Sequence, residues 1–230
     1  MEGWSDMAYL VSVEEAEDRW IAHVPDLPGC FAWDQGRDLA IQAVPDAIDH
    51  YVAWAKGHGI RITGLSAPMQ VSEVIRAWEF EDKNIVQAFF ATDRPPVHSE
   101  ELREYQLLLD ATLRDLAVVL EGLSPDDMEH TFIGERWPIS GVVAHIARAE
   151  WWYFDRLGLA FPRGQLPEDP IEAVMTVHQH TLDSLDDLVE RSGVLTVGGE
   201  TWSARKVLRR TLWHRRDHHE HILKLREQFR

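Results

Sequence analysis

Residues 202–222 read WSARKVLRRTLWHRRDHHEHI, and the fold that we expect for the whole chain follows from this stretch. It predicts one amphipathic helix that continues to Leu225, because apolar residues recur at helical spacing. These apolar residues are Val207, Leu208, Leu212, Ile222 and Leu225. Ser203 is the expected N-cap, since its hydroxyl can accept a hydrogen bond from a free backbone N–H of the first turn.

Four histidines stand in the second half of this predicted helix. His214 and His218 are four residues apart, so they lie on one face with one turn between them. His221 lies close to that face, whereas His219 points about 100° away. Two imidazoles in this arrangement can bind one metal ion from one side, but they need at least a third ligand from elsewhere in the chain. The alternative interpretation is a solvated, charge-rich helix.

The composition sets the broad class of protein. The 230 residues allow one large or two small domains, and 45% hydrophobic residues suffice for packed cores. A net charge of −16 disfavours binding to nucleic acid or to an anionic membrane. The single cysteine, Cys30, excludes an internal disulfide and fits a reducing compartment. Because we also find no signal peptide and no apolar run of about 18 residues, we expect a cytoplasmic protein.

The N-terminal part of the chain predicts a small α+β domain. Residues 9–24 predict two strands joined as a hairpin by the acidic turn at 14–18. A short strand at 31–33 and a helix at 37–57 follow. Pro45 either kinks this helix or marks a later start.

The order of hairpin, VPDLPGC turn at 24–30, strand and helix resembles the HicB-like antitoxin domain over residues 8–58. The resemblance implies a β-β-β-α-β domain related to the double-stranded-RNA-binding fold, which in that family covers a small toxin. No DNA-binding helix pair or basic arm follows here, and residues 1–95 hold 7 Lys and Arg against 16 Asp and Glu. An acidic domain is a poor reader of DNA or RNA. We therefore expect a structural or dimerisation module, with toxin binding as the alternative.

The segment after this domain leads to a linker. Residues 71–80 are ambiguous between helix and strand, and residues 85–90 predict a strand. Residues 93–97, DRPPV, are the predicted linker, because consecutive prolines stop regular structure. We therefore expect an α+β domain at residues 1–94 and an all-α domain at residues 95–230.

Four amphipathic helices are predicted in the second domain. They cover residues 99–122, 140–157 and 170–192, together with the helix of residues 203–225. Helices of this length bury their apolar faces most simply as a four-helix bundle. Such a bundle brings side chains from different helices to one interior point. His145 lies among apolar residues of the second helix, so we expect it to face inward beside His214 and His218.

WPISGVVAHIARAE at 137–150 and TWSARKVLRRTLWHRRDH at 201–218 resemble the DinB/YfiT family of four-helix metal-binding proteins. This resemblance covers residues 99–230. It implies a metal held by one histidine of the second helix and an H-x-x-x-H pair of the fourth. Carried over to this chain, the ligands are His145, His214 and His218. His221 is the main rival, and Asp217 is a candidate for orienting a ligand histidine.

Three neutral nitrogens that leave a metal position open are typical of a reactive site rather than a closed structural one. Imidazole ligands suit zinc or nickel. Either ion lowers the pKa of a bound water or thiol. Enzymes that resemble the family include thiol-S-transferases that use low-molecular-weight thiols, such as bacillithiol or mycothiol, and some isomerases. We therefore predict a metal-dependent enzyme, of the thiol-S-transferase or hydrolase type, that activates a low-molecular-weight thiol or water against a small electrophile.

Two other functions fit the sequence. One is a non-catalytic binding or scaffold protein whose antitoxin-like domain holds a partner, and the other is a sensor of a metal or an electrophile. For the enzyme we expect a small-molecule substrate and a homodimer, with no nucleic acid and no membrane as partner.

Arginines and aromatic residues near the histidines have two interpretations each. The arginines are Arg205, Arg209, Arg210, Arg215 and Arg216. We expect them to pair with acidic neighbours, with recognition of the carboxylates of a thiol cofactor as the alternative. The aromatic residues are Trp151, Trp152, Tyr153 and Trp213. Core packing is expected for them, and a pocket wall is the alternative.

Overall fold

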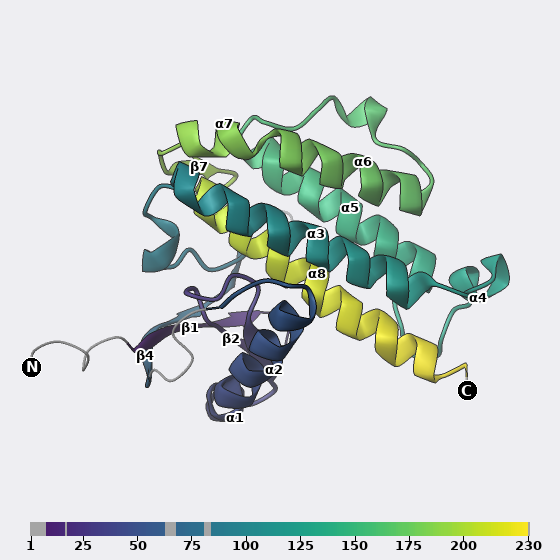
Figure 1. Cartoon of the computed structure of the whole chain (residues 1–230), viewed down its shortest axis with the longest axis horizontal. Helices are drawn as coiled ribbons and strands as arrows, with labels where there is room; N and C mark the ends of the chain where they lie inside the picture. Colours follow the sequence, from purple (N-terminus) through teal and green to yellow (C-terminus); the bar gives the residue numbers. More distant parts are fainter. Residues whose placement is uncertain (1–7, 17, 63–67, 81–83, 230) are drawn as a thin grey trace, which may run out of the picture. The chain divides into compact units, whose positions relative to one another are not determined.

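A computed structural model describes residues 8–16, 18–62, 68–80 and 84–229 of the chain (Figure 1). These residues divide into two compact units. One unit contains the residues up to Pro95 together with Val194–Arg209, and the other contains Pro96–Gly193 and the residues from Arg210 onward. The segment 194–209 thus belongs to the unit that also holds the N-terminal part. The division into separate domains at residues 94 and 95 stays a prediction.

The first unit is built on a four-stranded sheet in the order β3-β2-β1-β4. Its strands are β1 (Tyr9–Ala16), β2 (Arg19–His23), β3 (Phe31–Asp34) and β4 (Met69–Arg76). β1 pairs antiparallel with β2 and parallel with β4. A parallel pair needs a crossover connection, which α1 (Arg37–Gln42) and α2 (Val44–Gly57) supply. An α+β region therefore precedes the helical region, while the HicB-like assignment of residues 8–58 stays a prediction.

The acidic turn predicted at residues 14–18 starts too early. Its first three residues belong to β1, which continues to Ala16. Glu14 is buried in this strand. Its Oε1 lies 2.8 Å from Nε2 of His23, and its Oε2 accepts a hydrogen bond from the backbone N–H of Ala88 at 3.0 Å. A buried carboxylate that is hydrogen-bonded in this way is stable inside a sheet, which composition alone does not reveal.

Other boundaries in this unit also differ from expectation. The predicted helix at 37–57 is two helices, with Pro45 in the first turn of α2. The ambiguous segment 71–80 forms β4 and β5 (Trp78–Phe80). β5 pairs antiparallel with β6 (Asn84–Val86), so the strand predicted at 85–90 ends at Val86.

The first residue of the predicted linker at 93–97 is buried rather than exposed to solvent. Asp93 closes the short helix η2 (Ala91–Asp93) and is 1% exposed. Its carboxylate receives hydrogen bonds from Nε and Nη2 of Arg209, at 2.8 and 2.9 Å. The two prolines that follow stop regular structure as predicted, but Asp93 is anchored by a residue 116 positions away.

Another hairpin in this unit was not predicted. It joins β7 (Leu195–Val197) to β8 (Glu200–Trp202), so Trp202 belongs to a strand rather than to the helix. Gly198 and Gly199 form the two-residue turn, with φ of 58° and 77°. Two positive φ angles are what a type I′ turn needs, and the Gly-Gly pair was the signal that could have revealed it.

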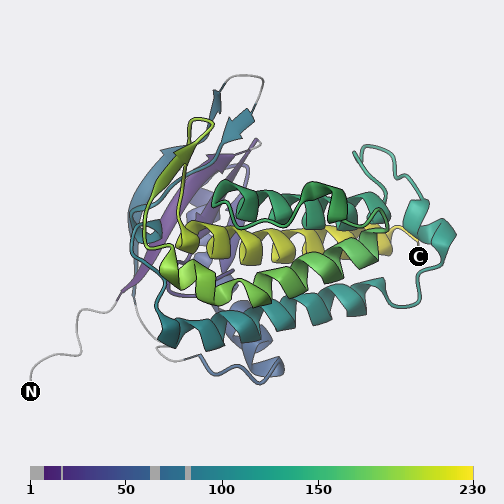
Figure 2. The ribbon, with the colours of Figure 1, turned by 90° about the horizontal axis from the view of Figure 1, so that it is seen from above.

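The second unit contains four long helices that run side by side in both ribbon views (Figures 1 and 2). They are α3 (Leu102–Leu120), α5 (Ile139–Arg156), α6 (Pro170–Asp183) and α8 (Ala204–Glu227), the last of which starts in the first unit. Apolar side chains from all four form one core, which includes Leu116, Val143, Ile146, Val177, Ile222 and Leu225. The predicted helical region is therefore present.

Shorter elements modify this region. They are η3 (Ser99–Glu101), α4 (Pro125–Glu129), η4 (Arg163–Gln165) and α7 (Leu185–Glu190). The helix predicted at 170–192 is interrupted at Ser184, between α6 and α7. The capping prediction for α8 is confirmed, because Oγ of Ser203 accepts a hydrogen bond from the backbone N–H of Lys206 at 3.1 Å.

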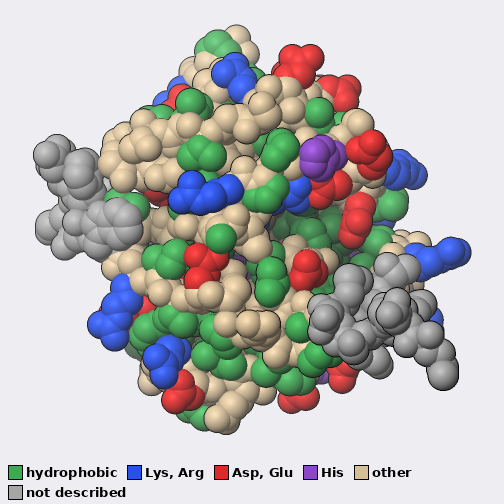
Figure 3. Space-filling view, turned by 90° about the vertical axis from the view of Figure 1, so that its left-hand side faces the viewer, with side chains coloured by type: hydrophobic (Ala, Val, Ile, Leu, Met, Phe, Trp, Pro, Cys, Tyr) green, Lys and Arg blue, Asp and Glu red, His purple; other side chains and the backbone are tan. Residues whose placement is uncertain are grey.

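In the described ranges, no helix has the length and apolar character that crossing a membrane requires. On the face shown in Figure 3, side chains of both charge signs lie among apolar and uncharged groups.

Candidate metal centre

Three of the predicted site residues lie together in the helical unit. His145, His214 and His218 each offer one ring nitrogen, and these nitrogens lie within 4.8 Å of one another. Nε2 of His214 is 3.1 Å from Nε2 of His145 and 3.0 Å from Nε2 of His218. His214 is buried, and the other two rings are half-buried. The cluster is therefore compact, and two of its three residues are partly exposed.

Helix geometry produces this cluster. The four-residue spacing in α8 places His214 and His218 one above the other. α5 contributes His145, whose ring centroid lies 4.9 Å from that of His214 and 5.0 Å from that of His218, edge to face in both cases. The indole of Trp137 stacks on the ring of His145 at 4.7 Å and restricts its rotation.

The two short distances fit a cation better than they fit hydrogen bonds. A ring nitrogen carries either one hydrogen or one lone pair, so Nε2 of His214 cannot form hydrogen bonds to both neighbouring nitrogens. Two nitrogens that bind one zinc ion at about 2.0–2.1 Å lie about 2.9 Å apart at an angle of 90° and about 3.3 Å apart at the tetrahedral angle. The separations of 3.0 and 3.1 Å fall between these values. The three residues could therefore hold one divalent ion.

The surroundings favour the neutral form of His145 and His214. Burial is the main cause that lowers the pKa of His145 to about 4, and the charges of Arg148 and Arg136 contribute to this decrease. Burial is also the main cause that lowers the pKa of His214 well below its ordinary value. Positive charges nearby, such as those of Arg210 and Arg215, lower this pKa as well. A neutral imidazole is the form that binds a metal ion, so the lone pairs are available at neutral pH.

The other predicted candidates occupy different places. Nε2 of His221 lies 2.9 Å from Oε2 of Glu135, and His221 is not part of the three-histidine cluster. Asp217 is half-buried on α8, and its orienting role stays a prediction. Cys30 is buried in the first unit.

Two of the four aromatic candidates flank His214. The rings of Tyr153 and Trp213 are buried, and each has its centroid 6.0 Å from that of His214. Trp151 instead donates a hydrogen bond from Nε1 to the carbonyl oxygen of Phe161 at 2.9 Å. Tyr153 and Trp213 therefore combine core packing with a position at the site.

Arg215, one of the five arginines expected to pair with acidic neighbours, connects all four helices. Its Nε and Nη2 donate to the two carboxylate oxygens of Glu150 on α5, at 2.6 and 2.7 Å. Its Nη1 donates to the carbonyl oxygen of Leu109 on α3 at 3.2 Å and to Nδ1 of His178 on α6 at 3.1 Å. The buried cation is thus paired and hydrogen-bonded, which is the condition for a stable interior charge.

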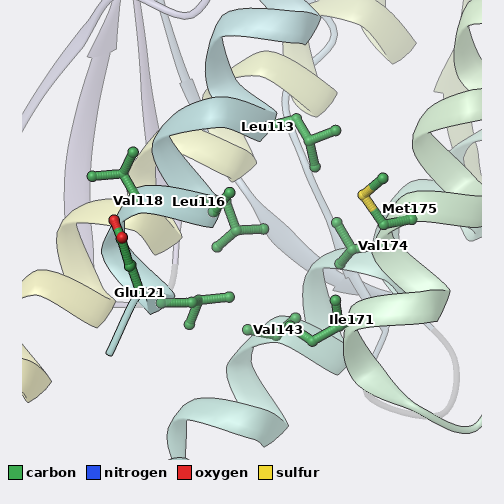
Figure 4. A pocket seen from close by; sticks show the side chains of 10 residues that line it. Leu113, Leu116, Val118, Glu121, Val143, Ile171, Val174 and Met175 are labelled. Carbon is green, nitrogen blue, oxygen red and sulfur yellow. The ribbon is translucent and has the colours of Figure 1, made fainter. Parts of the chain in front are cut away.

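The same unit also contains an apolar cavity (Figure 4). It has a volume of about 440 Å³ and is lined by Leu113, Leu116, Val143, Val174, Met175 and neighbouring residues of α3, α5 and α6. Glu121 at its edge is the charged residue among them. None of the three histidines lines this cavity, so the candidate metal centre is a different place.

Comparison with known proteins finds one family for the helical region. A model of the DinB superfamily matches residues 108–222, half of the chain, and the matched range contains all three histidines. No curated protein and no solved structure matches the chain.

Proposed function

The chain belongs to the DinB superfamily, and from this premise we propose that it is a metal-dependent enzyme. In this proposal His145, His214 and His218 hold one divalent ion, zinc or nickel. The observation that supports it most is that ring nitrogens from two helices converge at separations that one ion can bridge. The donor set adds support, because imidazole nitrogens suit both ions.

A bound ion would act as a Lewis acid that lowers the pKa of a low-molecular-weight thiol or water, which supplies a nucleophile near neutral pH. Three protein ligands leave at least one position for that molecule. In the thiol reaction, a bond forms between the sulfur and the electrophilic carbon while the bond to the leaving group breaks. The thiol proton departs with the leaving group, so no oxidant or reductant takes part.

The residues of the chain would hold the ligands and exclude water. Trp137 restricts the ring of His145 by stacking. The buried rings of Tyr153 and Trp213 keep water from the flanks of His214. Arg215 ties α8 to α5 through Glu150 and so fixes the two helices that carry the ligands.

Elemental analysis and a thiol-transfer assay on the purified protein test this proposal. We expect one zinc or nickel ion per chain in the wild type. The variants His145→Ala, His214→Ala and His218→Ala should each lose most of the metal and the transfer of a thiol to a model electrophile.

The matched controls are His219→Ala and His221→Ala on the same helix, and both should keep the metal. Loss of metal in His221→Ala with retention in His218→Ala would show that the ligand set is wrong. Full metal content and unchanged transfer in His214→Ala would exclude the mechanism.

A further inference from the structure

Arg210 is a buried cation one helical turn before His214. Its side chain is 5% exposed. The other buried basic residues of α8 each face a carboxylate: Lys206 pairs with Glu200, Arg209 with Asp93 and Arg215 with Glu150. Arg210 has no carboxylate partner among the described residues, where its hydrogen bond runs from Nη2 to the hydroxyl oxygen of Tyr153 at 3.2 Å.

Most of the hydrogen-bonding capacity of Arg210 is unused. Nε and Nη1 are buried and meet no acceptor in the part of the chain that the structure describes. These two nitrogens carry three N–H groups. A buried guanidinium with free donors and no counter-charge is unfavourable, and an anion that enters removes both deficits at once.

Two aromatic rings connect Arg210 with the candidate metal centre. Cζ of Arg210 lies 4.9 Å from the ring centroid of Tyr153 and 5.4 Å from that of Trp213. The same two rings flank His214 at 6.0 Å. In addition, residues four apart in a helix have Cβ atoms about 5–6 Å apart, which places Arg210 beside His214 on one face.

Around Arg210 and the candidate metal centre, positive charge would also exceed negative charge. The three histidines are neutral when they bind an ion, so a divalent ion would add its full charge to that of Arg210. Glu150 on the neighbouring helix α5 already pairs with Arg215. An anionic reactant would therefore meet positive charge on both sides.

We propose that Arg210 and the hydroxyl of Tyr153 form an anion-binding subsite beside the metal centre, and that one of the reactants carries a carboxylate there. The assignment of this anion to a reactant rests on the proposed function, whereas the subsite itself needs no metal. A carboxylate suits it because a guanidinium offers charge-assisted N–H groups to such oxygens.

The test compares two thiols of similar size on the cobalt-loaded protein: 3-mercaptopropionate, which is anionic, and 2-mercaptoethanol, which is neutral. The cobalt–thiolate absorbance gives the Kd of each. We expect the wild type to bind 3-mercaptopropionate about tenfold more tightly or better. Arg210→Met should keep cobalt and 2-mercaptoethanol binding but lose this preference, whereas Arg210→Lys should keep part of it.

The control variant is Arg103→Met, which removes an exposed arginine of α3 and should leave the preference unchanged. Equal affinity of the cobalt-loaded wild type for both thiols would overturn the inference and leave the proposed function standing. A wild type that binds no cobalt would overturn the proposed function instead.

The subsite can then still be tested without metal. Propionate should raise the Tm of the metal-free wild type but not that of Arg210→Met, while propanol should not distinguish the two proteins. An equal response of both proteins to propionate would overturn the subsite, and the same experiment with inorganic phosphate shows whether other anions enter.

Discussion

Arg215 and Glu150 form a doubly hydrogen-bonded ion pair inside the helical unit, with N–O distances of 2.6 and 2.7 Å. Arg215 directly follows His214 on α8, and Glu150 lies five residues after His145 on α5. The pair therefore joins the two helices that carry the candidate ligands. Its loss should affect both the stability of the unit and the spacing of the histidines.

Glu150→Gln should lower the free energy of unfolding by about 3–5 kcal/mol, because it leaves the charge of Arg215 buried without a partner. Denaturant unfolding measures this loss, and metal content should fall with it. Asp155→Asn is the control, since it breaks a part-exposed ion pair with Arg156 at the end of the same helix. It should change the free energy by less than about 1 kcal/mol. Similar losses in both variants would contradict the special role of the buried pair.

Arg210→Met should leave the stability of the metal-free protein unchanged or raise it, since it removes a buried cation that has no carboxylate partner among the described residues. Arg215→Met should lower the stability, because it leaves the carboxylate of Glu150 buried without its ion-pair partner. Thermal unfolding of the two variants side by side gives the comparison. A loss in Arg210→Met as large as that in Arg215→Met would mean that Arg210 is a structural residue.

His178 should make the stability of the helical unit depend on pH. Its Nδ1 accepts from Nη1 of Arg215 at 3.1 Å, so Nε2 carries the hydrogen and donates to Oδ1 of Asp110 at 3.2 Å. Burial and then the charge of Arg215 lower the pKa of His178 to about 4, against the opposing effect of Asp110. The neutral ring is therefore the folded form at neutral pH.

The sign of this pH dependence follows from proton binding. An unfolded histidine titrates near pH 6.5, so between about pH 6.5 and 4 the unfolded chain holds a proton that the folded chain does not. The contribution of His178 is complete above this range and is lost as the pH falls through it. In the metal-free protein, the unfolding free energy should decrease more steeply with falling pH in the wild type than in His178→Asn. Parallel curves for the two proteins would refute this assignment.

Ser203→Ala should destabilise the start of α8 by about 1–2 kcal/mol, which is the cost of losing an N-cap. The hydroxyl oxygen of Ser203 accepts from the backbone N–H of Lys206 and donates to the carbonyl oxygen of Asp93 at 2.6 Å. Ser203→Thr keeps both groups and should recover most of the loss in chemical unfolding. An alanine variant as stable as the threonine variant would rule out the capping role.

The candidate site could be predicted because each part of it is local in sequence. The spacing of His214 and His218 follows from one helix, and the apolar neighbours of His145 indicate which way its ring faces. The convergence of the two helices was expected from the four-helix bundle, and the family resemblance indicated the three ligands.

Pairings across long separations could not be predicted in the same way. Asp93 stands in a segment whose prolines indicate a linker, and only the fold brings it to Arg209. The same limit applies to the arginines of α8, because nothing local distinguishes Arg215, which has a full set of partners, from Arg210. The helix break at Ser184 has no proline or glycine that would predict it. The turn at Gly198 and Gly199, in contrast, could have been predicted from its Gly-Gly pair.

The helix α8 passes from one compact unit to the other between two consecutive residues, Arg209 and Arg210. The first unit is therefore assembled from two stretches of chain, and the later stretch lies inside the range that the family model matches. A gene fragment that stops at Pro95 would omit Lys206, whose ammonium group donates to Glu200 and to the carbonyl oxygen of Gln87. Moving the first unit onto another protein would therefore require Val194–Arg209 to be moved together with the N-terminal part.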